Sequence, residues 1–185
     1  MSVTRPSTMR AVVAAIVLAA GASTRFGAPK QQLLLGTVLE RVRKARGVAD
    51  IVVVLGAHDV EADARTVQCP DWERGPGASL RCGLAALAPE TEAAVVVLAD
   101  GPRLSPEAID RVVSAWRDSA GEVVAASYGG VRGHPVLLAR AVWPKIPDEG
   151  ARAFEPTLVP CDDLGAPGDV DFPADLRRSA AGDEE

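Results

Sequence analysis

Aromatic residues and cysteines are scarce in this sequence. Phe, Trp and Tyr make up 4% of the 185 residues, so the core has to be built from Val, Leu, Ile and Ala, as in proteins whose parallel strands are covered by helices. The three cysteines, Cys69, Cys82 and Cys161, are widely spaced and form no CxxC pair. We therefore expect neither a disulfide framework nor a zinc site, and we expect a reducing, cytoplasmic setting.

The sequence also lacks an excess of positive charge and a long hydrophobic run. Its formal net charge is -5 and its pI is about 5.1, values that give no overall attraction to nucleic acid or to an anionic membrane surface. None of its apolar runs approaches the ~20 residues of a membrane-spanning helix. A bound polyphosphate would therefore need a local cluster of basic side chains.

Short apolar runs alternate along the chain with segments of helical spacing. The runs span residues 11–19, 51–55, 93–99 and 123–126. The helical segments span residues 38–46, 78–88 and 106–117. Because the runs are β-branched and close at Gly, Asp or Ser, they are typical of buried strands. The alternation predicts an α/β fold, with an open, mostly parallel sheet wound by helices on both faces and ligands bound at the carboxyl ends of its strands.

One domain is expected over residues 10–178, because a chain of this length can bury a single core. Residues 1–9 are polar and residues 179–185 are small and acidic, so both ends are expected to be mobile tails. Residues 129–135 hold three glycines and a proline. This segment predicts a turn and a short hairpin added antiparallel to the sheet.

The first apolar run admits two interpretations. Arg5 and Arg10 precede it, and Ala20-Gly21-Ala22 is similar to a cleavage site, as in an export signal. Its β-branched content and its direct continuation into a pattern of Gly, Ser, Arg and Lys favour a buried strand instead.

A glycine-rich loop with two basic residues follows this strand, in the stretch LAAGASTRFGAPK at residues 18–30. Gly21 and Gly27 let backbone N–H groups point at an anion, and Arg25 and Lys30 add full positive charges. The five residues between the glycines exclude a P-loop, and GxGxxG is absent. Because Pro29 disfavours an immediate helix, we expect an extended loop that holds a polyphosphate. The alternative is that both basic residues are ordinary solvated charges.

The loop resembles the signature of nucleotidyltransferases that act on sugar phosphates, isoprenoid precursors and molybdopterin. Further motifs follow in order: PDWERGPGASLRCGL (70–84), VVVLADGPRLSPEAI (95–109), YGGVRGHPVLL (128–138), DEGARAF (148–154) and DVDFPADL (169–176). Together they resemble the molybdenum cofactor cytidylyltransferase branch of this family. The resemblance implies a Rossmann-like enzyme that transfers CMP from CTP to the phosphate of molybdopterin, with or without molybdenum, and releases pyrophosphate.

The resemblance also implies roles for individual residues. Arg25 and Lys30 would hold the β- and γ-phosphates, and Asp100 and Asp171 would bind Mg²⁺, with Mn²⁺ possible and Asp169 as the rival of Asp171. Residues implied to bind the nucleotide are Leu18, Ala19, Ala20, Gly21, Ser23, Gly27, Gly56, Ser79 and Leu80. Ordinary turn or capping roles are the alternative for both carboxylates and for Ser79.

On the acceptor side, the resemblance implies that His134 and Arg132 bind molybdopterin, with Arg81 a weaker candidate. A structural role is the alternative for His134. Ala20 stands where guanylyl-transferring relatives usually have glycine, which favours CTP over GTP. Three departures from the family pattern are visible. Gly101 replaces the glutamine of a motif that usually reads Asp-Gln-Pro, the segment QQLLLGTVLERV (31–42) is shorter than the family's usual stretch, and residues 153–168 are proline-rich and shorter than the corresponding elements of relatives.

Two other functions stay open at this point. The acceptor could be another small phosphorylated compound, such as a sugar phosphate. Alternatively, the chain is a non-catalytic binding module that hands cofactor to a molybdenum oxidoreductase partner. Neither interpretation involves nucleic acid or a membrane.

Overall fold

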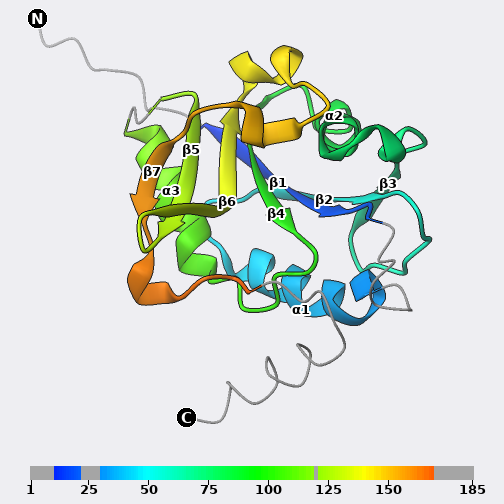
Figure 1. The fold of residues 1–185 in the computed structure, drawn as a ribbon, viewed down its shortest axis with the longest axis horizontal. Coiled ribbons are helices and arrows are strands. Elements are labelled where there is room, and N and C mark those ends of the chain that lie inside the picture. The colour runs from blue at the N-terminus through cyan, green and yellow to red at the C-terminus, as the bar shows by residue number, and fades with distance from the viewer. Residues whose placement is uncertain (1–10, 22–29, 119–120, 169–185) are drawn as a thin grey trace, which may run out of the picture.

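Seven strands form one sheet in the order β3-β2-β1-β4-β6-β5-β7 in the computed structural model, which describes residues 11–21, 30–118 and 121–168 (Figure 1). The strands are β1 (Val12–Ala19), β2 (Asp50–Leu55), β3 (Arg65–Gln68), β4 (Thr91–Leu98), β5 (Val123–Tyr128), β6 (Val131–Ala139) and β7 (Thr157–Pro160). All neighbouring pairs are parallel except those of β6, which is antiparallel to β4 and to β5. The predicted α/β fold with a mostly parallel sheet is confirmed.

Helices cover both faces of the sheet, because alternate strand residues point to opposite sides. The helices are α1 (Lys30–Lys44), α2 (Pro76–Ala85) and α3 (Pro106–Arg117). Val13, Ala15 and Val17 of β1 belong to a core shared with α1 and α3, whereas Ile16 belongs to a second core shared with α2. The two cores make the molecule a three-layer structure, with α1 below the sheet and α2 above it in Figure 1.

The local sequence signals identified most elements, with errors at their ends. The helix expected from residue 38 begins at Lys30, directly after Pro29, and the helix expected from residue 78 begins at Pro76. The helix at 106–117 is confirmed, and its Ser105 Oγ accepts a hydrogen bond from the Glu107 N–H at 3.2 Å. Strands β3 and β7 were missed because their side chains are mostly exposed and carry no buried apolar run.

The predicted hairpin is present, with Gly129 and Gly130 at φ +60° and +76° in the turn between β5 and β6. Positive φ at two successive turn residues matches the twist of a two-residue hairpin and is readily adopted by glycine. The hairpin is not an addition at the edge, however. Strand β6 lies between β4 and β5 inside the sheet, where every backbone group of its middle can find a partner.

The first apolar run is the buried strand β1, in the middle of the sheet. Among the described residues, no helix combines the length and the hydropathy that a membrane span needs. The tails expected at 1–9 and 179–185 lie outside the described residues.

Candidate active site

The site is organised by the point at which the strand order reverses. The chain runs from β1 outward to β2 and β3, and then returns to place β4 on the other side of β1. In open α/β sheets, the carboxyl ends of strands at such a point form the ligand crevice. Leu18 is paired with Leu98 and Ala19 with Leu55, so three strands end at the same level.

This register brings several predicted residues to one edge. The Ala99 N–H donates to the Leu18 carbonyl at 3.1 Å, so that Ala20 and Asp100 leave the sheet from neighbouring strands. Gly56 follows β2 on the other side of β1. The stretch predicted to bind the nucleotide and the first predicted metal ligand are therefore adjacent.

Part of the predicted site lies outside the described residues: Ser23, Arg25, Gly27, Asp169 and Asp171. For Lys30, the structure describes the backbone at the first residue of α1 and not the side chain. The phosphate-binding roles of Arg25 and Lys30 and the metal-binding role of Asp171 therefore stay predictions.

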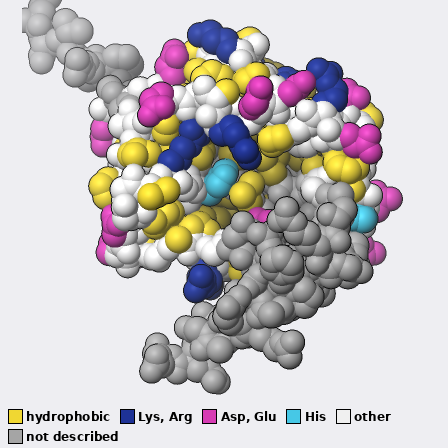
Figure 2. All heavy atoms as spheres, in the orientation of Figure 1, with side chains coloured by type: hydrophobic (Ala, Val, Ile, Leu, Met, Phe, Trp, Pro, Cys, Tyr) yellow, Lys and Arg dark blue, Asp and Glu magenta, His cyan; other side chains and the backbone are white. Residues whose placement is uncertain are grey.

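A cavity of ≈ 420 Å³ opens beside Asp100, between the end of β4 and the β5–β6 hairpin. It is lined by Val97, Leu98, Asp100, Gly101, Leu104, Tyr128, Val131, Arg132, Gly133, His134, Ala166, Pro167 and Gly168. On this face of the molecule, basic side chains gather above an imidazole that is surrounded by hydrophobic side chains (Figure 2). The structure thus brings Asp100, Arg132 and His134 together in one cavity with mainly apolar walls.

His134 is held in one orientation by the sheet beneath it. Its Nδ1 lies 3.2 Å from the Val96 carbonyl oxygen, and burial lowers the pKa of the imidazole below its usual 6.5. The ring is therefore neutral near pH 7, and because a carbonyl only accepts, Nδ1 carries the proton and donates it. Nε2 is left as a hydrogen-bond acceptor.

Arg132 joins the hairpin to a short 3₁₀ helix, η3 (Gly150–Ala153). Its guanidinium donates to the Phe154 and Ala151 carbonyls at 2.7 and 2.8 Å, and burial lowers its pKa. An arginine stays charged in proteins even when its pKa falls, so the cavity keeps a fixed positive charge at its rim. The motifs at 128–138 and 148–154 are thus partners in space.

The sequence did not single out Tyr128 or residues 166–168 as cavity walls. The Tyr128 hydroxyl donates to the His134 carbonyl at 2.9 Å, which fixes the hairpin next to the imidazole, and burial raises the pKa of Tyr128 to about 12. The only available signal was that Tyr128 is the single tyrosine and opens the YGGVRGHPVLL motif. Residues 166–168 line the cavity because the chain folds back onto residues 97–104 and 128–134, which are distant in sequence.

The residues predicted to bind the nucleotide are closely packed. A Cβ on Gly56 would lie 2.6 Å from the Ala20 carbonyl oxygen and 2.8 Å from the Trp72 Cβ, so Gly56 lets these segments meet. Leu80 is 1% exposed and belongs to the core under α2. The Leu80 side chain therefore packs in this core, and Ser79, at 4% exposure, is nearly as buried. The nucleotide-binding roles of Leu80 and Ser79 stay predictions.

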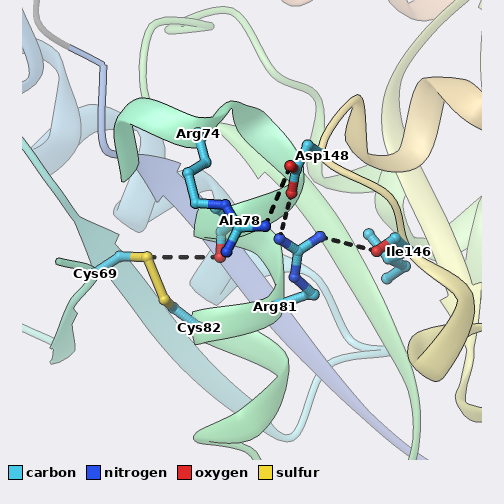
Figure 3. Close-up of polar contacts among 7 residues, drawn as sticks. All are labelled: Cys69, Arg74, Ala78, Arg81, Cys82, Ile146 and Asp148. Atoms are coloured by element: carbon cyan, nitrogen blue, oxygen red, sulfur yellow. Dashed lines mark hydrogen bonds and ion pairs between the residues drawn. A yellow bond between two sulfur atoms is a disulfide. The ribbon is translucent and has the colours of Figure 1, made fainter. Parts of the chain in front are cut away.

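Helix α2 and the residues just before it are tied to the segment at residues 146–148 (Figure 3). Arg81 donates to the Ile146 carbonyl at 2.9 Å and to the Asp148 carboxylate at 2.5 Å, and Arg74 lies 3.3 Å from the same carboxylate. The Asp148 carbonyl accepts from the Gly77 N–H at 2.9 Å. Arg81 is thus tied to Asp148 and is not positioned as an acceptor-binding residue. We call Arg74, Arg81 and Asp148 the α2 clamp.

Removing the charge of Asp148 should change how stability depends on pH. The hydrogen bond from Arg81, together with the charge of Arg74, holds the pKa of Asp148 below its usual 3.8. A lowered folded-state pKa stabilises the fold above the unfolded pKa, and this stabilisation is lost as the pH falls through the folded value. The gap in unfolding free energy between wild type and D148N should therefore be full at about pH 5 to 7 and shrink below about pH 4.

Urea-induced unfolding at several pH values checks this prediction. E149Q is the matched control, because Glu149 is the exposed neighbour that lies outside the α2 clamp. A gap for D148N that persists unchanged at the lowest pH would show that the clamp does not depend on the carboxylate charge.

A disulfide joins Cys69, directly after β3, to Cys82 on α2, which corrects the expectation that the cysteines form none (Figure 3). Their Cα atoms are 5.8 Å apart, within the range for disulfides. The sequence did not predict this disulfide, because two cysteines 13 residues apart match no recognisable motif. Only the packing of α2 against β3 brings Cys69 and Cys82 together. The expectation of a reducing setting was based on the absence of disulfides, and the Cys69–Cys82 bond removes that argument.

Alkylation of the unfolded protein tests the disulfide. Without reduction, one cysteine should be labelled, the buried free Cys161, whereas three should be labelled after treatment with a dithiol. Mass spectrometry of the intact chain counts the labels. Three labels without reduction, in protein purified without reductant, would contradict the disulfide.

Comparison with known proteins shows the family to which this chain belongs. A family model described as "MobA-like NTP transferase domain" matches residues 15–154. A molybdenum cofactor guanylyltransferase from Mesorhizobium japonicum is 32% identical over 157 residues, covering 79% of this chain and 74% of that protein.

Solved structures are similar over nearly the whole chain. Rv0371c from Mycobacterium tuberculosis H37Rv has a TM-score of 0.77 at 28% identity, covering 93% of this chain and 99% of that one. A second structure of Rv0371c, in complex with manganese, has a TM-score of 0.69 at 27% identity, with coverages of 90% and 97%. This chain therefore belongs to the MobA-like NTP transferase domain family of nucleotidyltransferases.

Proposed function

We propose that this protein transfers CMP from CTP to the phosphate of a molybdopterin-type acceptor and releases pyrophosphate. The observation that carries the proposal is the cavity beside Asp100, which lies where the sheet's ligand crevice begins and is lined by Arg132 and His134. The similarity to a molybdenum cofactor guanylyltransferase supports a role in molybdenum cofactor biosynthesis. GTP is the competing donor, because that relative is named for guanylyl transfer.

The chemistry of the cavity favours a heterocyclic acceptor over a sugar phosphate. The surface of its lining is mainly apolar, with Val97, Leu98 and Leu104 among its residues, and such walls leave sugar hydroxyls without hydrogen-bond partners. The acceptor lone pair at His134 Nε2 suits an N–H donor of a ring and disfavours an anionic phosphate. His134 therefore binds the ring, and the fixed charge of Arg132 attracts the phosphate.

A divalent ion fits this site in part through Asp100. Among the described residues, no three His, Cys, Asp or Glu side chains lie together, but Mg²⁺ is commonly held by one or two carboxylates together with substrate phosphates and water. Asp100 and Asp171 would hold the ion, which supplies charge neutralisation at the phosphate oxygens when bound. The manganese complex of Rv0371c supports a divalent ion in this family, and Mg²⁺ with Mn²⁺ as a substitute is our proposal.

The remaining catalytic work falls to the glycine loop. Arg25 and Lys30 would neutralise the β- and γ-phosphates and stabilise the departing pyrophosphate, while Gly21 and Gly27 allow the close approach of the loop backbone. A phosphomonoester is already largely ionised near pH 7 and needs no general base. A neutral His134 that donates to Val96 agrees with a binding role rather than proton transfer.

Pyrophosphate release tests the proposal. The protein would be incubated with Mg²⁺, molybdopterin and each of CTP, GTP, ATP and UTP, and CTP should give the highest kcat/KM. A preference for GTP would show that the protein transfers GMP in place of CMP, and the proposed nucleotidyl transfer to molybdopterin would still stand. Turnover of a sugar phosphate without turnover of molybdopterin would overturn the proposed acceptor.

A further inference from the structure

One wall of the cavity is supplied by a segment from far along the chain. Residues 161–168, here called the strap, leave the outer part of the sheet, where the Cys161 N–H donates to the Ser127 carbonyl at 2.9 Å. At the other end of the strap, the Arg103 N–H donates to the Pro167 carbonyl at 2.9 Å. Residues 166–168 lie in the cavity lining, next to Gly101.

The strap is fixed by the protein itself. Asp163 accepts two hydrogen bonds from the Arg111 guanidinium of α3, at 2.7 and 2.5 Å. Asp162 accepts from the Gly129 N–H in the hairpin turn. Because α3 and the hairpin are both built on the sheet, these contacts hold the strap in place before any ligand binds.

Gly101 lies directly under this wall. A Cβ at position 101 would lie 3.1 Å from the Pro167 Cβ and 3.4 Å from the Gly168 carbonyl oxygen. The first of these distances is tighter than ordinary van der Waals contact, so the strap would have to retreat by a few tenths of an ångström. The hydrogen bonds that Arg111 and Arg103 donate to the strap oppose this displacement.

We propose that Gly101 is a specificity-determining residue, whose lack of a side chain lets Pro167 form an apolar wall of the acceptor cavity. This inference rests on the proposed function, in which the cavity holds the acceptor. The wall presents carbon atoms next to Asp100, where a longer polar side chain would present hydrogen-bonding groups. It therefore selects the face of a planar heterocycle over a hydroxyl-rich ring.

A double-mutant cycle tests the contact between Gly101 and Pro167. G101A should lower kcat/KM for molybdopterin about tenfold and change KM for the nucleotide less than twofold, because displacement of a positioning wall impairs alignment of one substrate. P167G removes the Cβ that the new methyl group meets, so adding G101A to P167G should have little further effect. P167A keeps that Cβ, so the loss of kcat/KM caused by G101A should persist in the double variant with P167A. A166G is the control for added backbone freedom in the strap.

Hydrogen exchange in the ligand-free protein gives a readout that does not depend on turnover. Amides of residues 161–168 should exchange faster in G101A than in wild type, while those of α2 stay unchanged. Equal losses for both substrates, additive effects in the cycle, or an unchanged strap would overturn this inference. A wild-type protein inactive with molybdopterin would instead overturn the proposed function, and the exchange data would still report on the contact.

Discussion

Nucleotidyl transfer should fall by about 10²-fold or more when Asp100 is replaced by alanine, while the fold is kept. Asp100 follows β4 at the point where the strand order reverses, and it lines the cavity together with His134. Its carboxylate is the described group best placed to hold a divalent ion against the triphosphate. Without it, the proposed ion would lose a ligand, and the repulsion between the two phosphate anions would be less well compensated in the transition state.

Two further variants sharpen this prediction. D100N keeps the size and a hydrogen-bonding side chain but removes the charge, and it should lose nearly as much activity as D100A. D118A removes an exposed aspartate beyond the end of α3 and should leave activity unchanged. Single-turnover rates at saturating nucleotide, together with thermal unfolding of each variant, separate lost chemistry from a lost fold.

Retention of activity in D100A would exclude a catalytic role for this carboxylate. The alternative, a non-catalytic module that hands cofactor to an oxidoreductase, makes a different prediction. In that case the wild type would show no transfer activity and a folded D100A would still support cofactor delivery in cells, because such a module needs the cavity and not the charge at its edge.

Gly77→Ala should lower the free energy of unfolding by about 3 kcal/mol or more. A Cβ at this position would lie 1.7 Å from the Pro147 carbonyl oxygen and 2.9 Å from the Asp148 carbonyl carbon. Both atoms belong to backbone that the α2 clamp holds in place, so no side chain can swing away. The helix and the segment would have to separate, which breaks the hydrogen bond from the Gly77 N–H.

Gly36→Ala is the matched control, because it makes the same chemical change in a different environment. Gly36 is exposed in the interior of α1, and a Cβ there would meet nothing within 4 Å. Alanine should therefore stabilise the protein by about 0.5–1 kcal/mol, through higher helix propensity and a less flexible unfolded chain. Parallel urea titrations measure both variants. A G77A protein as stable as wild type would contradict the close packing of α2 against residues 147–148.

The α2 clamp also limits what the first turn of this helix can do. Helix N-termini often bind phosphate through free N–H groups. Here the Gly77 N–H is taken by Asp148 and the Ala78 N–H by the Gly75 carbonyl. We therefore expect the triphosphate to be held by the glycine loop after β1 rather than by α2, which leaves Ser79 as a positioning or base-contacting residue in the proposed site.

Local patterns in the sequence predicted the elements that bury apolar side chains. Strands β1, β2, β4 and β5 were identified because each is a short β-branched run, and α3 because its cap and its spacing agree. The start of α1 was placed too late, since its first turns lack a regular apolar stripe. The exposed edge strands β3 and β7 left no pattern to find.

The chemistry of the site was predictable to the extent that it is carried by contiguous motifs. The position of Asp100 after a buried strand and the YGGVRGHPVLL motif drew attention to this region, and in the structure Asp100, Arg132 and His134 line the same cavity. The direction of the His134 hydrogen bond could not be foreseen, because it depends on Val96 of a strand 38 residues earlier. That bond decides that Nε2 accepts and does not donate.

By itself, the sequence determined the α/β class, the buried strands, the family signature and the residue types available for phosphate and metal binding, because these depend on neighbours within a few positions. Only the tertiary structure decided that Cys69 bonds to Cys82, that Asp148 is shared by two arginines, and that Pro167 covers Gly101. Each of these is a contact between segments distant in sequence. Such contacts follow from how helices pack on a sheet and from where the chain returns, and no local pattern encodes them.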